Sequence, residues 1–115
     1  MSKKTLAKTK KKYGVVIVGA GWCGVSSQLD ELRIRPASHA EAVIALKERA
    51  ELSAFVDTDK KALKLCNLLY PQIPTFLSVE EMFKTLKPDI AIIATHPDTH
   101  TSYIDFFSEK RIKAI

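Results

Sequence analysis

The sequence of 115 residues predicts an α/β fold, a doubly wound parallel sheet with helices on both faces. Short apolar runs alternate with helical segments along the chain, the pattern of parallel strands joined by right-handed crossover helices. The first run, at 14–18, leads directly into a glycine-rich turn. A later run, at 89–95, forms a continuously apolar strand that should be central, because a parallel sheet is covered on both faces.

The first crossover of this sheet is interrupted. A helix is expected at 25–35, and Pro36 ends it because proline lacks an N–H donor and clashes with the preceding turn. Ser38 and Glu41 then form a predicted capping box that opens a second helical run at 42–49.

Capping residues and prolines set the remaining elements. Asp59 can cap one helix, and a second capping box pairs Ser78 with Glu81. Lys87-Pro88 ends the helix that this box opens, whose apolar side chains should face the core. The expected elements are a strand at 52–56, a helix at 60–69, a strand at 75–77, a helix at 79–86, a helix from Asp98 or Thr99 to about Lys110, and a strand at 112–115.

The glycine-rich turn has the pattern G-x-G-x-x-G at residues 19–24. In dinucleotide-binding folds the first glycine permits a tight turn, the second lets backbone approach a pyrophosphate, and the third allows close helix packing. The helix that should follow offers N–H donors to phosphate. The alternative is a turn that merely closes a strand-helix junction. The predicted cofactor-binding residues in this turn are Gly19, Gly21, Trp22, Cys23 and Gly24.

A carboxylate after the next strand supports the nucleotide interpretation. Asp57, followed by Thr58, lies where an acid can accept hydrogen bonds from an adenosine ribose. Its charge favours NAD over NADP, whose 2′-phosphate it would repel, although Lys60 and Lys61 could partly offset that repulsion. A methyltransferase that uses S-adenosylmethionine shares both features and stays an alternative.

The separation between the glycine turn and Asp57 is longer than the roughly 20 residues that are usual in this kind of fold. We expect the surplus to be an inserted loop at 27–37, near the adenosine side of the site.

Charge and composition exclude several other classes. The net charge is +5, but six of the 18 basic residues are lysines before residue 13, and the others nearly balance the 13 acidic residues. We expect a flexible tail at 1–12 ahead of one domain at 13–115, not a nucleic-acid-binding arm. No apolar run approaches the roughly 20 residues of a membrane span and no secretory signal is present, so a cytoplasmic protein without a membrane partner is expected.

The two cysteines, Cys23 and Cys66, are too few for a disulfide scaffold or a metal cage. Cys66 lies on the apolar stripe of the helix at 60–69 and should behave as a small buried hydrophobe. No metal site is predicted.

From residue 13 to 115 the chain resembles the N-terminal domain of the Gfo/Idh/MocA oxidoreductases. The strand, the glycine turn and the acid occur in that family's order, and a segment after the fourth strand is similar to its pattern Thr-Pro-Asn-x-x-His. Here His96 stands in place of the proline and Pro97 in place of the asparagine. The resemblance implies that Thr95, His96 and Pro97 line the nicotinamide ribose, and that His100, which matches the family histidine, lies near the nicotinamide or the substrate.

The same resemblance implies hydride transfer between a nicotinamide cofactor and a small hydroxylated or carbonyl compound such as a sugar or cyclitol. The family's Glu-Lys-Pro lysine would lie just beyond Ile115, and its substrate domain is absent from these 115 residues. We therefore expect the chain to supply the cofactor half, with His100 as the one contributor to chemistry left open. A stand-alone, non-catalytic binding module is the alternative, and a homo-oligomer is also left open.

Overall fold

Four parallel strands form the sheet, in the order β3-β2-β1-β4. The computed structural model describes residues 12–21 and 24–115, so the predictions for Trp22, Cys23 and nearly all of the tail at 1–12 lie outside the described residues. The strands are β1 (Tyr13–Val18), β2 (Ala50–Val56), β3 (Thr75–Phe76) and β4 (Ile90–Ile93).

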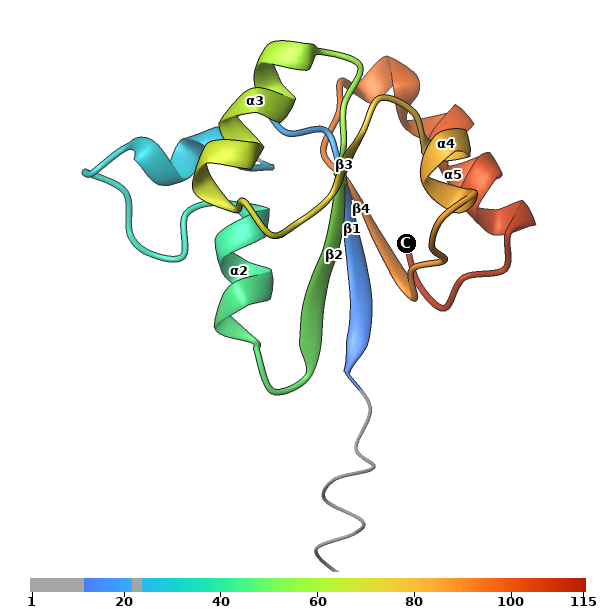
Figure 1. The fold of residues 1–115 in the computed structure, drawn as a ribbon, viewed down its shortest axis with the longest axis horizontal. Coiled ribbons are helices and arrows are strands. Elements are labelled where there is room, and N and C mark those ends of the chain that lie inside the picture. Colours follow the sequence, from blue (N-terminus) through green and yellow to red (C-terminus); the bar gives the residue numbers. More distant parts are fainter. Residues whose placement is uncertain (1–11, 22–23) are drawn as a thin grey trace, which may run out of the picture.

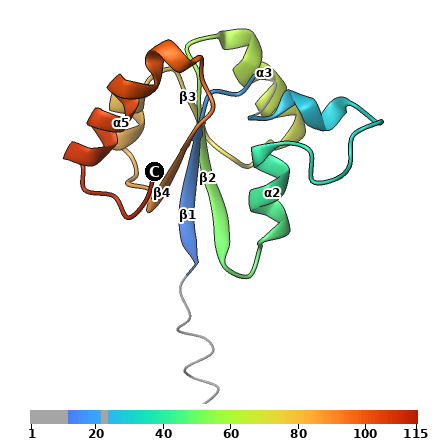
Figure 2. The same cartoon turned by 180° about the vertical axis from the view of Figure 1, so that it is seen from behind.

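Helices pack on both faces of this sheet, as the sequence predicts. The helical elements are η1 (Ser26–Leu29), α2 (His39–Ala45), α3 (Lys60–Leu69), α4 (Val79–Phe83), η2 (Pro97–Thr99) and α5 (His100–Glu109). The helices α2 and α3 cover one face, and α4 and α5 cover the other (Figures 1 and 2). None of the helices in the described ranges is long and apolar enough to cross a membrane.

Alternation along β1 divides the core into two layers. Val15 and Ile17 face α2 and α3, whereas Val16 and Val18 face α4 and α5. Parallel pairing aligns Val15 with Leu52 and Val16 with Ala54, so β2 contains one extra residue at this point. This bulge restores the correct alternation for the end of β2, because side chains switch faces at every residue.

Each layer is closed by side chains from its own pair of helices. Between the sheet and α3, Cys66 is fully buried, as predicted, and burial raises the pKa of its thiol to about 12. On the other face, Met82 and Phe107 are fully buried, and the Phe107 ring lies 5.4 Å from Phe106 and 5.9 Å from Phe83 between ring centroids. Burial of these large apolar groups is the main stabilising contribution of each layer.

The prediction of a helix at 25–35 is wrong. The chain forms only the short η1 and then turns until residue 38. The Asp30 carboxylate accepts the Leu32 N–H at 3.0 Å, a local bond that competes with helix formation. The restart at Ser38 is confirmed, since its hydroxyl accepts the Glu41 N–H at 3.1 Å. That helix ends at Ala45, not at residue 49.

Strand β4 occupies a different place from the one expected. It pairs with β1 on one side, but on the other side its contact is a single parallel bridge between Ile90 and Ala114. The predicted strand at 112–115 is thus present as one bridging residue, and β4 is the edge of the four-stranded sheet. Ile92 and Ile93 are only half-buried as a result. The helix expected at 79–86 is also shorter, ending at Phe83.

Replacing Phe107 by alanine should lower the free energy of unfolding by about 3–5 kcal/mol, because the change opens a cavity in the layer under α5. Ile104 on the same helix is 44% exposed, so Ile104→Ala should cost no more than about 1 kcal/mol. Equilibrium unfolding in urea measures both values. Equal losses in the two variants would contradict the assignment of Phe107 to the core.

Candidate dinucleotide-binding site

Three strands end side by side at one edge of the sheet. The Gly19 N–H donates to the Val56 carbonyl at 2.7 Å, and the Ala94 N–H donates to the Val18 carbonyl at 2.7 Å. These bonds fix the segments after β1, β2 and β4 next to one another. The chain passes from β1 to β2 and β3 on one side and then to β4 on the other side of β1. This edge is therefore a topological switch point, the usual ligand position in open α/β sheets.

The turn after β1 requires glycine at two positions. Gly19 has a φ of 102°, and a Cβ there would lie 2.7 Å from the Ala94 carbonyl. A Cβ on Gly24 would collide with the Gly19 carbonyl oxygen. The turn therefore folds back on itself against the end of β4. A larger residue at position 19 or 24 would prevent this close approach.

Gly21 is different, because none of the residues in the ranges 12–21 and 24–115 crowds it. A Cβ at this position would meet no heavy atom within 4 Å. Its carbonyl accepts the Val25 and Ser26 N–H groups, both at 2.9 Å, so the backbone around it is held in place. The described residues of the turn thus leave open space beside Gly21, which fits the close approach of a pyrophosphate.

The Asp57 carboxylate joins the end of β2 to this turn. Its Oδ2 accepts the Ala20 N–H at 2.8 Å, and its Oδ1 accepts the Asp59 N–H at 2.9 Å. Since a carboxylate can accept about four hydrogen bonds, each oxygen keeps capacity for a ligand hydroxyl. Thr58 is exposed in the same turn.

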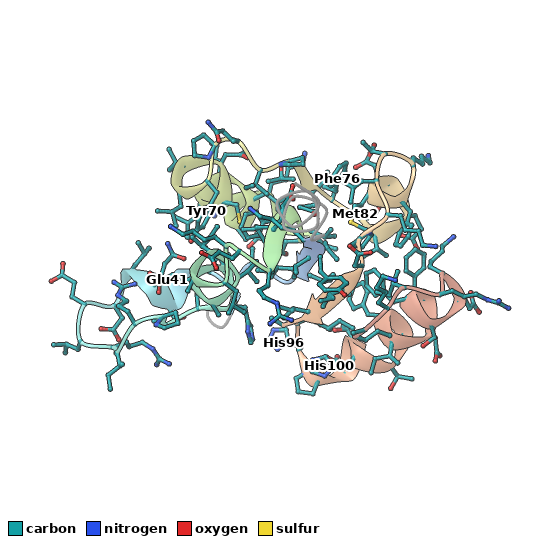
Figure 3. All side chains as sticks on the ribbon, turned by 90° about the horizontal axis from the view of Figure 1, so that it is seen from below. Glu41, Tyr70, Phe76, Met82, His96 and His100 are labelled. Atoms are coloured by element: carbon teal, nitrogen blue, oxygen red, sulfur yellow. The ribbon has the colours of Figure 1, made fainter. Side chains whose placement is uncertain are left out.

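The segment after β4 is held by its own side chains. Thr95 Oγ1 lies 2.6 Å from Thr99 Oγ1, and the Thr99 hydroxyl donates to the His96 carbonyl at 2.7 Å. His100 Nε2 donates to the Thr95 carbonyl at 2.9 Å. His96 is exposed and Pro97 begins η2; Figure 3 shows His96 and His100 near one another on this side of the molecule. His100 thus makes a local hydrogen bond that fixes the loop.

One feature of the predicted phosphate site is wrong. The α-helix expected directly after the third glycine is replaced by η1, and α2 begins only at His39. The start of α2 does return to the glycine turn, where the Ala40 N–H donates to the Gly24 carbonyl at 3.0 Å. That donor is therefore already engaged by the chain itself.

The structure places Gly19, Gly21, Gly24, Asp57 and Thr95 at the same edge of the sheet, but the sequence contains no signal for the Ala20 amide that holds Asp57. A backbone N–H carries no side-chain pattern, so only the fold could show this partner. Within residues 12–21 and 24–115, no group of three or more His, Cys, Asp or Glu residues could hold a metal ion.

A parallel sheet in this order, with a glycine turn and an acid at its carboxyl edge, defines the dinucleotide-binding class of α/β domains. Residues 13–115 match the Gfo/Idh/MocA family, described as an oxidoreductase family with an NAD-binding Rossmann fold. The chain belongs to this family and is an NAD-binding domain. Family membership gives no support to the methyltransferase alternative.

Relatives and solved structures agree with this assignment. The chain is 31% identical over 88 residues to YteT of Bacillus subtilis (strain 168), a protein that bears the name of an oxidoreductase. Its fold is similar to that of the WlbA dehydrogenase from Bordetella pertussis, crystallised with NADH and UDP-GlcNAcA, with a TM-score of 0.67 and 24% identity over 86% of this chain. It is also similar to a myo-inositol dehydrogenase from Corynebacterium glutamicum ATCC 13032, with a TM-score of 0.69 and 19% identity over 90% of this chain.

These proteins are much longer than the chain. The match to YteT spans 72% of this chain but 19% of that protein, and the two solved structures are covered over 26% and 27% of their length.

Alanine at Gly19 should destabilise the fold, whereas alanine at Gly21 should leave its stability nearly unchanged. Gly19→Ala forces a positive φ and a clash with Ala94, so it should lower the free energy of unfolding by roughly 1–3 kcal/mol. Gly21→Ala places its methyl group in open space and should change that value by less than about 0.5 kcal/mol. Urea unfolding of both variants provides the measurement. A destabilised Gly21→Ala would show that the space above this glycine is not free.

Proposed function

We propose that the chain is the cofactor-binding part of an oxidoreductase that transfers a hydride between NAD and a small hydroxylated or carbonyl substrate, of the sugar or cyclitol class. The observation that carries this proposal is the juxtaposition of the open Gly21 position with the Asp57 carboxylate, which is tied to the same turn through Ala20. When bound, the nicotinamide cofactor supplies the hydride chemistry, and the protein supplies binding and orientation.

Each group of site residues takes one part of the cofactor in this proposal. Backbone at Gly19, Gly21 and Gly24 holds the pyrophosphate, together with Trp22 and Cys23 of the same turn, which lie outside the described residues. Asp57, followed by Thr58, accepts hydrogen bonds from the adenosine ribose. After the end of β4, Thr95, His96 and Pro97 line the nicotinamide ribose, and His100 keeps this loop in position through the Thr95 carbonyl.

The charge at Asp57 supports NAD as the preferred cofactor. A fixed carboxylate repels the 2′-phosphate of NADP, and its two oxygens are already oriented by backbone donors. Lys60 and Lys61 begin α3 only a few residues further on, so NADP binding is weakened without being abolished.

The substrate class rests on the neighbours' chemistry. The names of two solved structures refer to a UDP-sugar acid and to myo-inositol, which are both polyhydroxylated. We place the proton-transfer group and most substrate contacts in parts of such proteins that this chain does not match, and we leave His100 open as a contributor from this chain.

A stand-alone binding module would bind the same cofactor and turn over nothing. Both functions are distinguished by assaying the native gene product with NAD and a panel of polyols and sugar acids. NAD reduction with any of them supports the oxidoreductase, and binding of NADH without any turnover supports the module.

Gly21→Ala should weaken NADH binding at least about tenfold, because its methyl group fills the space into which we place the pyrophosphate. The variant should still unfold like the unmodified chain, which separates loss of binding from loss of fold. Fluorescence titration with NADH measures the dissociation constant. An unchanged constant would remove Gly21 from the phosphate site.

Asp57→Asn should raise the NADH dissociation constant about tenfold and reduce the preference for NADH over NADPH, because it removes the charged acceptor of the ribose. Asp59→Asn is the matched control, since it removes the same charge two residues away and asparagine still caps α3. Titration of both variants with both cofactors gives the ratio. An unchanged ratio in Asp57→Asn would exclude Asp57 from the ribose site.

A further inference from the structure

Two threonines after β4 share a hydrogen-bond chain whose direction can be worked out. Thr95 Oγ1 and Thr99 Oγ1 lie 2.6 Å apart, and the Thr99 hydroxyl donates to the His96 carbonyl at 2.7 Å. Each hydroxyl has one hydrogen and two lone pairs. Because the Thr99 hydrogen is used on the His96 carbonyl, the hydrogen between the two threonines belongs to Thr95. Thr95 is therefore the donor in this pair and Thr99 the acceptor.

The His96 carbonyl fixes this direction. It accepts the Thr99 backbone N–H at 3.0 Å as well as the Thr99 hydroxyl. A carbonyl oxygen has two lone pairs, so both are occupied by Thr99. Turning the Thr99 hydrogen toward Thr95 would break one of these bonds. The chain of donors thus runs from Thr95 through Thr99 to the backbone of His96.

The direction of the chain decides what Thr95 can offer to a ligand. A free threonine hydroxyl rotates and can donate or accept, whereas here the Thr95 hydrogen is committed to Thr99. Its oxygen keeps lone pairs, so toward a ligand it acts as an acceptor. A hydroxyl that donates within a chain is also polarised, which strengthens it as an acceptor. The ligand group at Thr95 must therefore carry a hydrogen to donate.

The side chain of Thr95 lies between the glycine turn and η2. A Cβ built on Gly19 would come within 3.0 Å of Thr95 Cγ2, so the methyl group lies next to this turn while Oγ1 meets Thr99. His100 Nε2 donates to the Thr95 carbonyl at 2.9 Å and holds the backbone of the same residue. Thr95 is only half-buried, which leaves it accessible. Its hydroxyl is thus oriented before any ligand binds.

We propose that Thr99 is a positioning residue for the cofactor, which orients the Thr95 hydroxyl so that its oxygen accepts a hydrogen bond from a hydroxyl of the nicotinamide ribose. This inference rests on the proposed function, which places the nicotinamide ribose against Thr95. It adds a residue that acts through Thr95 and gives the hydrogen bond a direction.

The place of Thr95 next to the glycine turn favours the ribose over the nicotinamide ring. In the dinucleotide, each ribose is joined directly to the pyrophosphate, whereas the ring lies one unit further away. A side chain that touches the turn at Gly19 is therefore close to the first unit beyond the phosphates. Phosphate oxygens that carry no hydrogen cannot donate to Thr95, so the chain of hydroxyls also separates the ribose position from the pyrophosphate position.

Three ligands of increasing length test the proposal. ADP ends before the second ribose, ADP-ribose contains it, and NADH adds the ring. Thr99→Val removes the hydroxyl with little change of shape, so it should raise the dissociation constants of NADH and ADP-ribose about fivefold and change that of ADP by less than about twofold. Thr99→Ser keeps the hydroxyl and should restore all three values. Calorimetric titration measures each constant.

Ser102→Ala is the matched control. The Ser102 hydroxyl donates to the Thr99 carbonyl at 3.1 Å, so this variant removes a hydroxyl next to Thr99 without entering the chain of donors. It should leave all three constants unchanged. Equal weakening of ADP and ADP-ribose by Thr99→Val, or no weakening of either, would overturn the positioning role. Weakening of NADH alone would overturn the assignment to the ribose.

A double-mutant cycle gives a second, independent test. Thr95→Val keeps the methyl group against Gly19 and removes the acceptor itself. If Thr99 acts through Thr95, adding Thr99→Val to Thr95→Val should change the NADH dissociation constant by less than about twofold. Additive losses would overturn the inference. Failure of the unmodified chain to bind NADH and ADP would instead overturn the proposed function, and this result appears before any variant is compared.

Discussion

The hydrogen bond between the Ala20 amide and the Asp57 carboxylate is the contact on which the site depends. It connects the turn after β1 to the turn after β2 across the sheet edge, and a second backbone amide, that of Asp59, fixes the other carboxylate oxygen. One side chain thus completes the backbone bonding of two turns and still has free acceptor capacity. Its removal would affect both the shape of the phosphate turn and the recognition of the ribose.

Much of the fold could be predicted from the sequence, because it depends on local signals. The apolar runs specify β1 and β2. The predicted N-cap residues Ser38, Asp59 and Ser78 each cap a helix in the structure. The glycine pattern also locates the turn correctly, since Gly19 has a positive φ and Gly24 packs against it. For all of these positions the physical cause lies within a few residues of chain.

The features that sequence reasoning missed depend on distant parts of the chain. The place of β4 at the edge follows from how little of the segment around Ala114 pairs with it, which no periodicity shows. The extra residue in β2 is visible only in its pairing with β1. The helix expected after Gly24 failed because Asp30 forms a local turn and Pro36 prevents continuation, a competition whose outcome propensity alone could not decide.

The bond from the Ala40 N–H to the Gly24 carbonyl has a consequence for how such domains diverge. The chain leaves the glycine turn and returns to nearly the same point, so the length of the segment between them is not coupled to the geometry of that turn. Because the entropy cost of closing a loop grows slowly with its length, such a segment can lengthen or shorten at little cost. Searches that require a fixed spacing between the glycines and the acid would overlook relatives of this kind.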